Sequence, residues 1–148
     1  MQDFVHLHVH TQYSLLDGQA SVARLVDKAM KNGMKGIAVT DHGNMFGIKE
    51  FTNYVNKKNS GPKGEVKDLK KRIAGIEAGT IECEDKEAEI ADCKAKIVEA
   101  ESKLFKPIIG CEMYVARRTM DLREGKLDQS GYHLIVLAKN EKGYHNLI

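Results

Sequence analysis

Three histidines at alternate positions near the start of the chain are the residues whose types and spacing most clearly allow chemistry. His6, His8 and His10 lie in the run Phe-Val-His-Leu-His-Val-His-Thr at residues 4–11. Successive side chains of a β-strand point to opposite faces, so the imidazoles would share one face and the intervening apolar residues the other. We therefore predict that residues 4–10 form a buried strand whose apolar face packs and whose imidazole face can hold a metal.

Other residues that could bind a metal lie at or near the ends of further predicted strands. These residues are Asp17, Asp41, His42, Glu112 and His133. Together with His8 and His10 of the first strand, they make a set of seven candidates. Ligands bind at the carboxyl ends of the strands in α/β sheets and barrels, so these side chains are expected at a common rim. Histidine and carboxylate together suit zinc, manganese or iron. A bridging carboxylate such as Glu112 could hold two metals, as in many phosphoesterases.

Each of these signals also has an ordinary structural explanation. Alternating histidines can be satisfied polar groups, the Asp-His-Gly sequence at 41–43 makes a good turn, and Glu112 can simply face solvent. His6, which lies deeper along the strand, is interpreted as structural, and His145 as a surface residue. The repetition of His and acidic residues at several strand ends favours a metal site over these separate explanations.

The surrounding pattern predicts the elements that would position these side chains. Apolar residues recur at helical spacing over 22–32 and over about 45–57. Short apolar runs predict strands at 36–40, 107–115 and 132–138. Alternation of strand and helix is the signature of βα units and a parallel sheet, so the fold class is α/β.

One segment interrupts this alternation. Residues 58–105 are rich in lysine and glutamate, and their apolar residues lie three and four apart, as in coiled-coil heptads. The pattern predicts an antiparallel helical hairpin, with its turn near 78–84, inserted into a single domain that spans 1–148. Asn140 is expected to cap a last helix. The sequence stops one turn into that helix, which suggests a fragment of a longer protein.

Composition sets wider limits. The chain has 148 residues, a net charge of +2 and three cysteines. One domain of this length can bury a sizeable core, and the near-neutral charge argues neither for nor against nucleic acid. Without a signal sequence or a long apolar run, we expect a cytoplasmic protein with free thiols and no membrane span. Arg117 and Arg118, in a polar loop, could touch a phosphate or lie exposed.

Four segments resemble a known family. Residues 4–18, 38–47, 106–115 and 133–140 are similar to the opening region of the bacterial replicative DNA polymerase III alpha family, the polymerase and histidinol phosphatase (PHP) domain. His-x-His and Asp-His are common to all PHP domains, whereas Tyr-Ser-Leu-Leu-Asp-Gly and Ile-Gly-Cys-Glu resemble the polymerase branch. The resemblance implies a distorted (β/α)7 barrel, of which this chain would form about the first four βα units.

The resemblance also implies a trinuclear metal cluster. Its ligands within this chain would be His8, His10, Asp17, His42, Glu112 and His133. His8 and His10 would bind one metal, Glu112 would bridge it to a second metal that His133 binds, and Asp17 and His42 would bind the third. Asp41, the one residue given a catalytic assignment, would orient a ligand. The remaining ligands lie on later strands, so up to three metals are expected in the complete domain but fewer or none in this fragment, which is expected to be inactive.

For the intact protein, the resemblance implies a DNA-directed DNA polymerase whose PHP domain is a metal-dependent 3′–5′ exonuclease. The expected partners are the 3′ end of DNA and other subunits of the DNA polymerase III holoenzyme. Two alternatives stay open: a free-standing PHP phosphoesterase such as a histidinol phosphatase, and a non-catalytic docking domain for a proofreading subunit. A half-barrel leaves apolar strand edges exposed, so the fragment is expected to self-associate.

Overall fold

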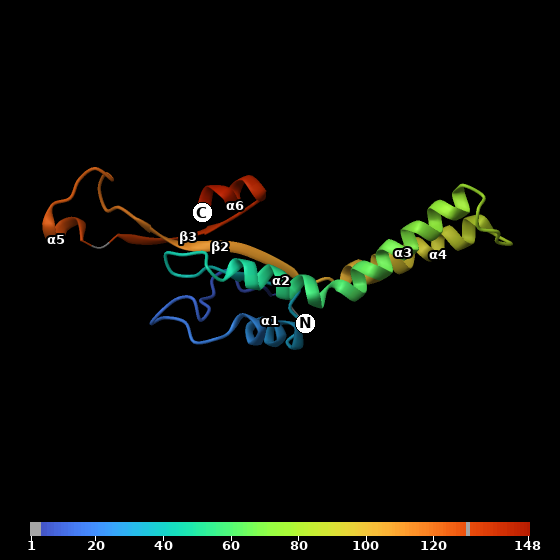
Figure 1. Cartoon of the computed structure of the whole chain (residues 1–148), viewed down its shortest axis with the longest axis horizontal. Helices are drawn as coiled ribbons and strands as arrows, with labels where there is room; N and C mark the ends of the chain where they lie inside the picture. Colours follow the sequence, from blue (N-terminus) through green and yellow to red (C-terminus); the bar gives the residue numbers. More distant parts are fainter. Residues whose placement is uncertain (1–3, 130) are drawn as a thin grey trace. The chain divides into compact units, whose positions relative to one another are not determined.

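The computed structural model describes residues 4–129 and 131–148 and has a mixed α/β architecture (Figure 1). It divides into two compact units, one from the described parts of 1–54 and 106–148 and the other from 55–105. Within the described residues, the elements in chain order are α1 (Val22–Lys31), β1 (Gly36–Val39), α2 (Ile48–Lys58), α3 (Ser60–Glu77), α4 (Lys86–Ser102), β2 (Lys106–Val115), α5 (Gly125–Asp128), β3 (Tyr132–Leu137) and α6 (Glu141–Leu147). None of these helices combines the length and apolar character needed to cross a membrane.

The sheet of the first unit has the strand order β1-β2-β3. β1 and β2 are parallel, with Gly36 opposite Lys106 and Val39 opposite Ile109. β3 runs antiparallel to β2, so the prediction that 132–138 continues a series of parallel βα units is wrong. The connection between β2 and β3 is a polar loop whose described residues, 116–129 and 131, contain one helix, the four-residue α5. It therefore offers no apolar helix face to pack across the sheet, as a parallel crossover requires.

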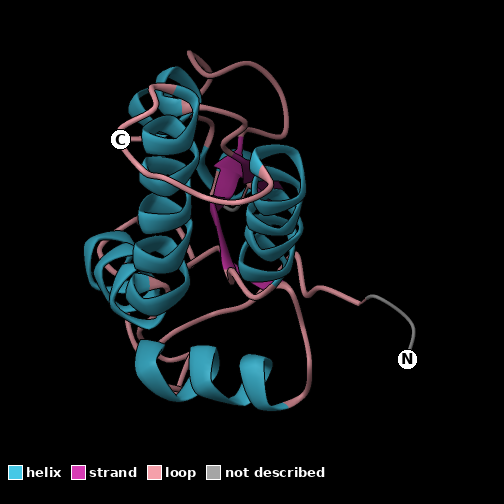
Figure 2. Cartoon of the chain, turned by 90° about the vertical axis from the view of Figure 1, so that its right-hand side faces the viewer, coloured by secondary structure: helices cyan, strands magenta, loops and turns pink. Residues whose placement is uncertain are grey.

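The segment 4–10, predicted as a buried strand, is not a strand of the sheet and bends at Leu7. Figure 2 draws the chain that follows the N-terminus as loop. It makes two backbone hydrogen bonds to the β1 region, from Ala38 N–H to the carbonyl of His6 and from Thr40 N–H to that of Val9, both 2.9 Å. The acceptors are three residues apart and the donors two, so one extra residue breaks the regular ladder. The predicted apolar face is also incomplete, because Leu7 is 52% exposed.

Helix α1 covers the predicted range 22–32 almost fully and packs near β1. It buries Val22, Val26 and Ala29, one side of an amphipathic helix. The chain leaves α1 through Gly33, which has a φ of +76°. Its N–H bonds to Met30 C=O and the following N–H bonds to Ala29 C=O. This is a Schellman motif, in which glycine adopts the left-handed conformation without a steric penalty.

In the second unit, α3 and α4 lie side by side (Figure 1). The buried apolar residues of these helices include Ile76 on α3 and Cys93 and Ala100 on α4. An ion pair of 2.6 Å between Arg72 and Glu89 joins the two helices at their exposed side. Exposed pairs of this kind add little stability, so the buried apolar seam is the main interaction between the helices.

Asn59 ties the two ends of the second unit together. Its Nδ2 donates to the carbonyl of Phe105 at 2.8 Å, and the Phe105 N–H donates to its Oδ1 at 2.9 Å. Both residues are buried, Asn59 being 5% exposed. The amide therefore pairs two backbone groups that have little access to water.

We predict that Asn59→Ala lowers the free energy of unfolding by about 2–4 kcal/mol, because it leaves two buried backbone groups unpaired at about 1–3 kcal/mol each. Urea or thermal unfolding measures the change. Asn56→Ala is the matched control, since Asn56 is exposed and is expected to change the value by about 0.5 kcal/mol or less. Equal stability of the two variants would contradict the assigned role of Asn59.

Candidate metal centre

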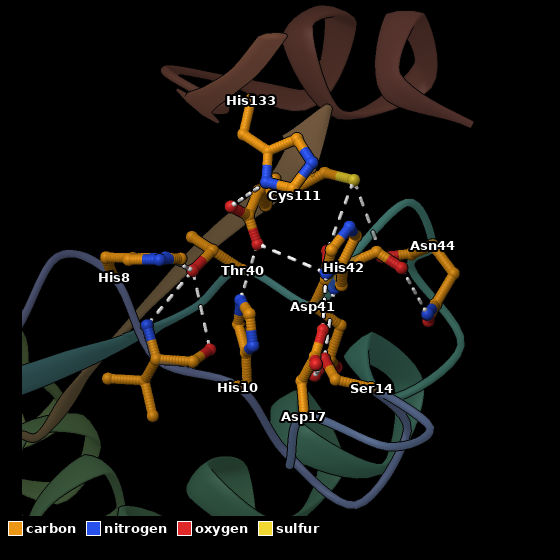
Figure 3. Close-up of polar contacts among 12 residues, drawn as sticks. His8, His10, Ser14, Asp17, Thr40, Asp41, His42, Asn44, Cys111 and His133 are labelled. Atoms are coloured by element: carbon orange, nitrogen blue, oxygen red, sulfur yellow. Dashed lines mark hydrogen bonds and ion pairs between the residues drawn. The ribbon is translucent and has the colours of Figure 1, made fainter. Parts of the chain in front are cut away.

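The structure brings the six predicted metal ligands into one cluster at the end of the sheet (Figure 3). Within the described residues, three groups each have three ligand atoms that lie within 4.8 Å of one another. The groups are His8 with His10 and Glu112, His10 with Asp17 and His42, and His42 with Glu112 and His133. His10, His42 and Glu112 each belong to two groups, so the three groups form a continuous set of donors.

Glu112 is the centre of this cluster. Its Oε2 lies 2.7 Å from His10 Nε2 and 3.7 Å from His42 Nδ1, and its Oε1 lies 3.0 Å from His133 Nδ1. His42 Nδ1 also lies 2.5 Å from the Asp17 carboxylate. The side chains of Asp17 and His133 are 43% and 44% exposed, whereas that of Glu112 is 9% exposed. The cluster is thus closed around Glu112 and open at Asp17 and His133, and His8 is exposed as well.

Three buried atoms of the cluster have no hydrogen-bond partner among the described residues: His10 Nε2, His42 Nε2 and Glu112 Oε2. The first and third lie close together, but their mutual orientation is not that of a hydrogen bond. Buried polar atoms are nearly always paired, and an unpaired one costs free energy. Imidazole nitrogens and a carboxylate oxygen that converge in this way suit a divalent metal such as zinc, manganese or iron.

The charge state of Glu112 fits this role. Burial opposes its ionisation, but contact with His10 and the positive charge available on His10, His42 and His133 outweigh that effect. The net result is a pKa below the ordinary value of 4.5. At neutral pH Glu112 is therefore an anionic ligand, as metal coordination requires.

Glu112 and His133 lie at the same edge of the sheet although their strands, β2 and β3, run in opposite directions. Tyr114 on β2 is opposite His133 on β3, and Glu112 is opposite Ile135. Glu112 and His133 are therefore diagonal neighbours on one face of an antiparallel pair. His133 lies near the amino end of β3, so its predicted place at a carboxyl strand end is wrong. Antiparallel pairing nevertheless sets the amino end of β3 beside the carboxyl end of β2.

His42 reaches the cluster because it follows β1 directly. It forms an isolated parallel bridge with Glu112 beyond the regular register of β1 and β2. The N–H of Gly43 donates to the Glu112 carbonyl at 2.8 Å, and the Glu112 N–H donates to the Asp41 carbonyl at 3.1 Å. These backbone bonds hold His42 beside Glu112, which is where the predicted ligand at the end of this strand has to lie.

Asp41 lies next to the cluster, but its carboxylate points to another set of partners. It is 1% exposed and accepts hydrogen bonds from the N–H and hydroxyl of Thr11 and from the hydroxyl of Ser14. The Ser14 hydroxyl in turn accepts the N–H of His42 at 3.0 Å. Asp41 thus fixes the loop that leads to Asp17, and its assignment as catalytic stays a prediction.

Sequence reasoning assigned no role to several residues that contact the cluster. The Thr40 hydroxyl lies 2.8 Å from His8 Nδ1. The Tyr114 ring lies 5.0 Å from that of His42 and 5.1 Å from that of His133, between centroids. Position on a strand was the available signal, because Thr40 precedes the Asp-His pair and Tyr114 shares a strand face with Glu112.

Other sequence expectations concern residues outside the cluster. His6 stacks its ring edge-to-face with Phe4, at 4.7 Å between centroids, and His145 has a side chain that is 65% exposed. Arg118 is engaged within its own loop by Asp128 and Glu124. This ion pairing is a structural explanation for Arg118 that competes with the phosphate contact.

Histidine and carboxylate donors gathered at the edge of a small α/β sheet define a candidate metal-binding domain. The sequence matches the PHP domain over residues 6–97 and 88–148, and the chain belongs to that family.

Similar proteins include the DNA polymerase III subunit alpha of Treponema pallidum, 39% identical over 146 residues, and that of Borreliella burgdorferi, 38% identical over 146 residues. Each alignment covers 98% of this chain and 9% of the relative. The protein of the same name from Aquifex aeolicus is 32% identical over 153 residues, 99% of this chain and 9% of the relative. The chain thus spans about a tenth of the length of these relatives.

We predict that Glu112→Gln lowers the amount of bound metal more than Asp17→Asn does. Glu112 belongs to two of the three donor groups and Asp17 to one, and an amide is a far weaker ligand than a carboxylate. Elemental analysis after dialysis against zinc measures bound metal per chain. Glu141→Gln is the control, because its side chain is 89% exposed and lies outside the groups. Equal metal content in all three variants would contradict the assignment.

We also predict that Cys111 is protected from alkylation. Burial raises the pKa of its thiol, and the Sγ contacts the carbonyls of Asp41 and Asn44. With little thiolate and little access, reaction with iodoacetamide at pH 8 should be at least about 10-fold slower than at Cys83, which is less buried. Mass spectrometry of the two peptides measures the rates. Similar rates in the folded protein would contradict the prediction, and denaturant should abolish any difference.

Proposed function

We propose that this chain is the N-terminal PHP region of a bacterial replicative DNA polymerase, a DNA polymerase III alpha subunit, and that its domain is a metal-dependent 3′–5′ exonuclease. Relatives with that name align with nearly the whole of the chain. The partners would be the 3′ end of DNA and the other holoenzyme subunits, in the cytoplasm. The fold would be about half of a (β/α)7 barrel, with 58–105 as an inserted helical hairpin.

The observation that carries the hydrolytic proposal is a set of buried ligand atoms on His10, His42 and Glu112, which have no hydrogen-bond partner in the part of the chain that the structure describes. The burial of such atoms costs free energy unless a ligand such as a metal pairs them, and metal-dependent hydrolysis requires that metal. Their convergence supports a centre that holds two or three divalent metals, of which zinc, manganese and iron fit the donors best.

The residues of this chain would have distinct tasks in phosphodiester hydrolysis. Glu112, held between His10 and His133, would bridge two metals. His8 and His10 would hold one metal, His133 the second, and Asp17 with His42 the third. Bound divalent metals would activate water and neutralise charge on the phosphate. His8, Asp17 and His133, the exposed donors of the cluster, would mark the side from which a DNA end approaches.

The test uses the full-length protein and a single-stranded DNA labelled at its 3′ end. His10→Ala removes a ligand from two donor groups and should lower metal-dependent release of the terminal nucleotide by at least about 100-fold. Polymerisation should be largely spared, because its active site would lie outside these residues.

His145→Ala is the matched control, since His145 is exposed and lies outside the cluster. Release that survives His10→Ala would sink the exonuclease assignment. A wild-type protein that binds metal but releases no nucleotide would overturn the exonuclease in favour of a docking domain, and a protein unable to polymerise would overturn the polymerase assignment.

A further inference from the structure

Thr40, the last residue before the Asp-His pair, is fully buried beside His8 (Figure 3). Its hydroxyl oxygen makes three contacts: 2.8 Å to His8 Nδ1, 3.0 Å to the N–H of Val9 and 3.4 Å to the carbonyl of Val9. Its backbone N–H also donates to the Val9 carbonyl at 2.9 Å. Thr40 therefore holds the segment that carries His8 and His10 by hydrogen bonds from both its backbone and its side chain.

The proton count at this hydroxyl restricts His8. A hydroxyl has one proton to donate and two lone pairs that accept. The Val9 N–H occupies one lone pair. If Nδ1–H of His8 occupies the other, the hydroxyl proton is left for the Val9 carbonyl, and each of the three contacts has a proton. If the hydroxyl instead donates to Nδ1, its contact with the Val9 carbonyl has no proton, and the imidazole proton is on Nε2.

The two arrangements differ in their consequence for a metal. An imidazole nitrogen that carries a proton has no lone pair to coordinate. With Nδ1 engaged by Thr40, Nε2 is the nitrogen left to bind a metal. Only the arrangement in which Nδ1–H donates to Thr40 keeps that nitrogen free.

We propose that Thr40 is a positioning residue that holds His8 in the Nδ1–H tautomer, so that Nε2 is available to the metal shared with His10 and Glu112. The inference rests on the proposed function, because it requires a metal at that group. Histidine ligands commonly donate their second nitrogen to a fixed acceptor, which orients the ring and selects the tautomer. Here the acceptor is a hydroxyl that sequence patterns for metal ligands do not mark.

A purely structural role for Thr40 gives a different expectation. The contacts with Val9 could hold the segment in place without any effect specific to His8. Both roles would make Thr40→Val harmful, so one variant cannot separate them. A double-mutant cycle with His8→Ala can, since it isolates the part of the effect that passes through the His8 side chain.

The experiment measures zinc affinity in the full-length protein by competition with a chromophoric chelator. Thr40→Val should weaken the tightest site that depends on His8 by about 10- to 100-fold, and Thr40→Ser, which keeps the hydroxyl, should restore most of the affinity. In the His8→Ala background, Thr40→Val should cause no further loss. Thr52→Val is the matched control, because the Thr52 hydroxyl bonds only to backbone carbonyls of α2 in the contacts described.

Three results would overturn the role of Thr40 alone: wild-type affinity in Thr40→Val, failure of serine to restore affinity, or an undiminished loss in the His8→Ala background. The last would assign the effect to Val9 and the backbone. A wild-type protein that binds no zinc would overturn the proposed metal centre and this inference together. Circular dichroism of each variant identifies misfolding, and if Thr40→Val fails to fold, the same cycle is run with Thr40→Ala, which also lacks the hydroxyl.

Discussion

The buried carboxylate of Asp41 is the constraint on which the candidate metal centre depends. A carboxylate that is 1% exposed is tolerated only when hydrogen bonds replace its lost hydration. Thr11 and Ser14 supply those bonds from a loop about thirty positions earlier in the sequence. The backbone carbonyl of Asp41 meanwhile accepts the N–H of Glu112. Asp41 thus joins its own segment, which carries His42, to the loop before Asp17 and to the strand that carries Glu112.

This arrangement explains why the donor cluster forms although the first segment is not a regular strand. The histidine-bearing stretch has only two backbone hydrogen bonds to the β1 region, too few to define side-chain directions by pairing alone. The Thr40 hydroxyl, which bonds to His8 Nδ1 and accepts the Val9 N–H, and the Thr11 hydroxyl, which donates to Asp41, supply the missing constraint. Irregular backbone at a site is stable when the surrounding contacts specify it in this way.

Much of the centre could be predicted from the sequence, because metal ligands are drawn from few residue types and strand ends are easy to locate. The structure gathers His8, His10, Asp17, His42, Glu112 and His133, the set that the family resemblance implied, whereas residue types and strand ends alone also pointed to Asp41. Two features of the fold could not be predicted from the sequence. The direction of β3 depends on how a polar loop returns to the sheet, and the extra residue in 6–9 depends on pairing with β1. Thr40 and Ser14 were missed because hydroxyl partners distant in sequence leave no spacing pattern.

The second compact unit illustrates a separate constraint on the same cluster. The crossover from β1 to β2 includes α2 and all of 55–105, yet the parallel register between the two strands is regular. Asn59 bonds both backbone groups of Phe105, so the ends of the insertion meet. Because these ends meet, most residues of the second unit add little to the effective length of the connection between β1 and β2. The entropy cost of closing that connection is therefore smaller than its number of residues implies. The register of β1 and β2, which continues to the bridge between His42 and Glu112, is thus regular across a crossover that contains a whole compact unit.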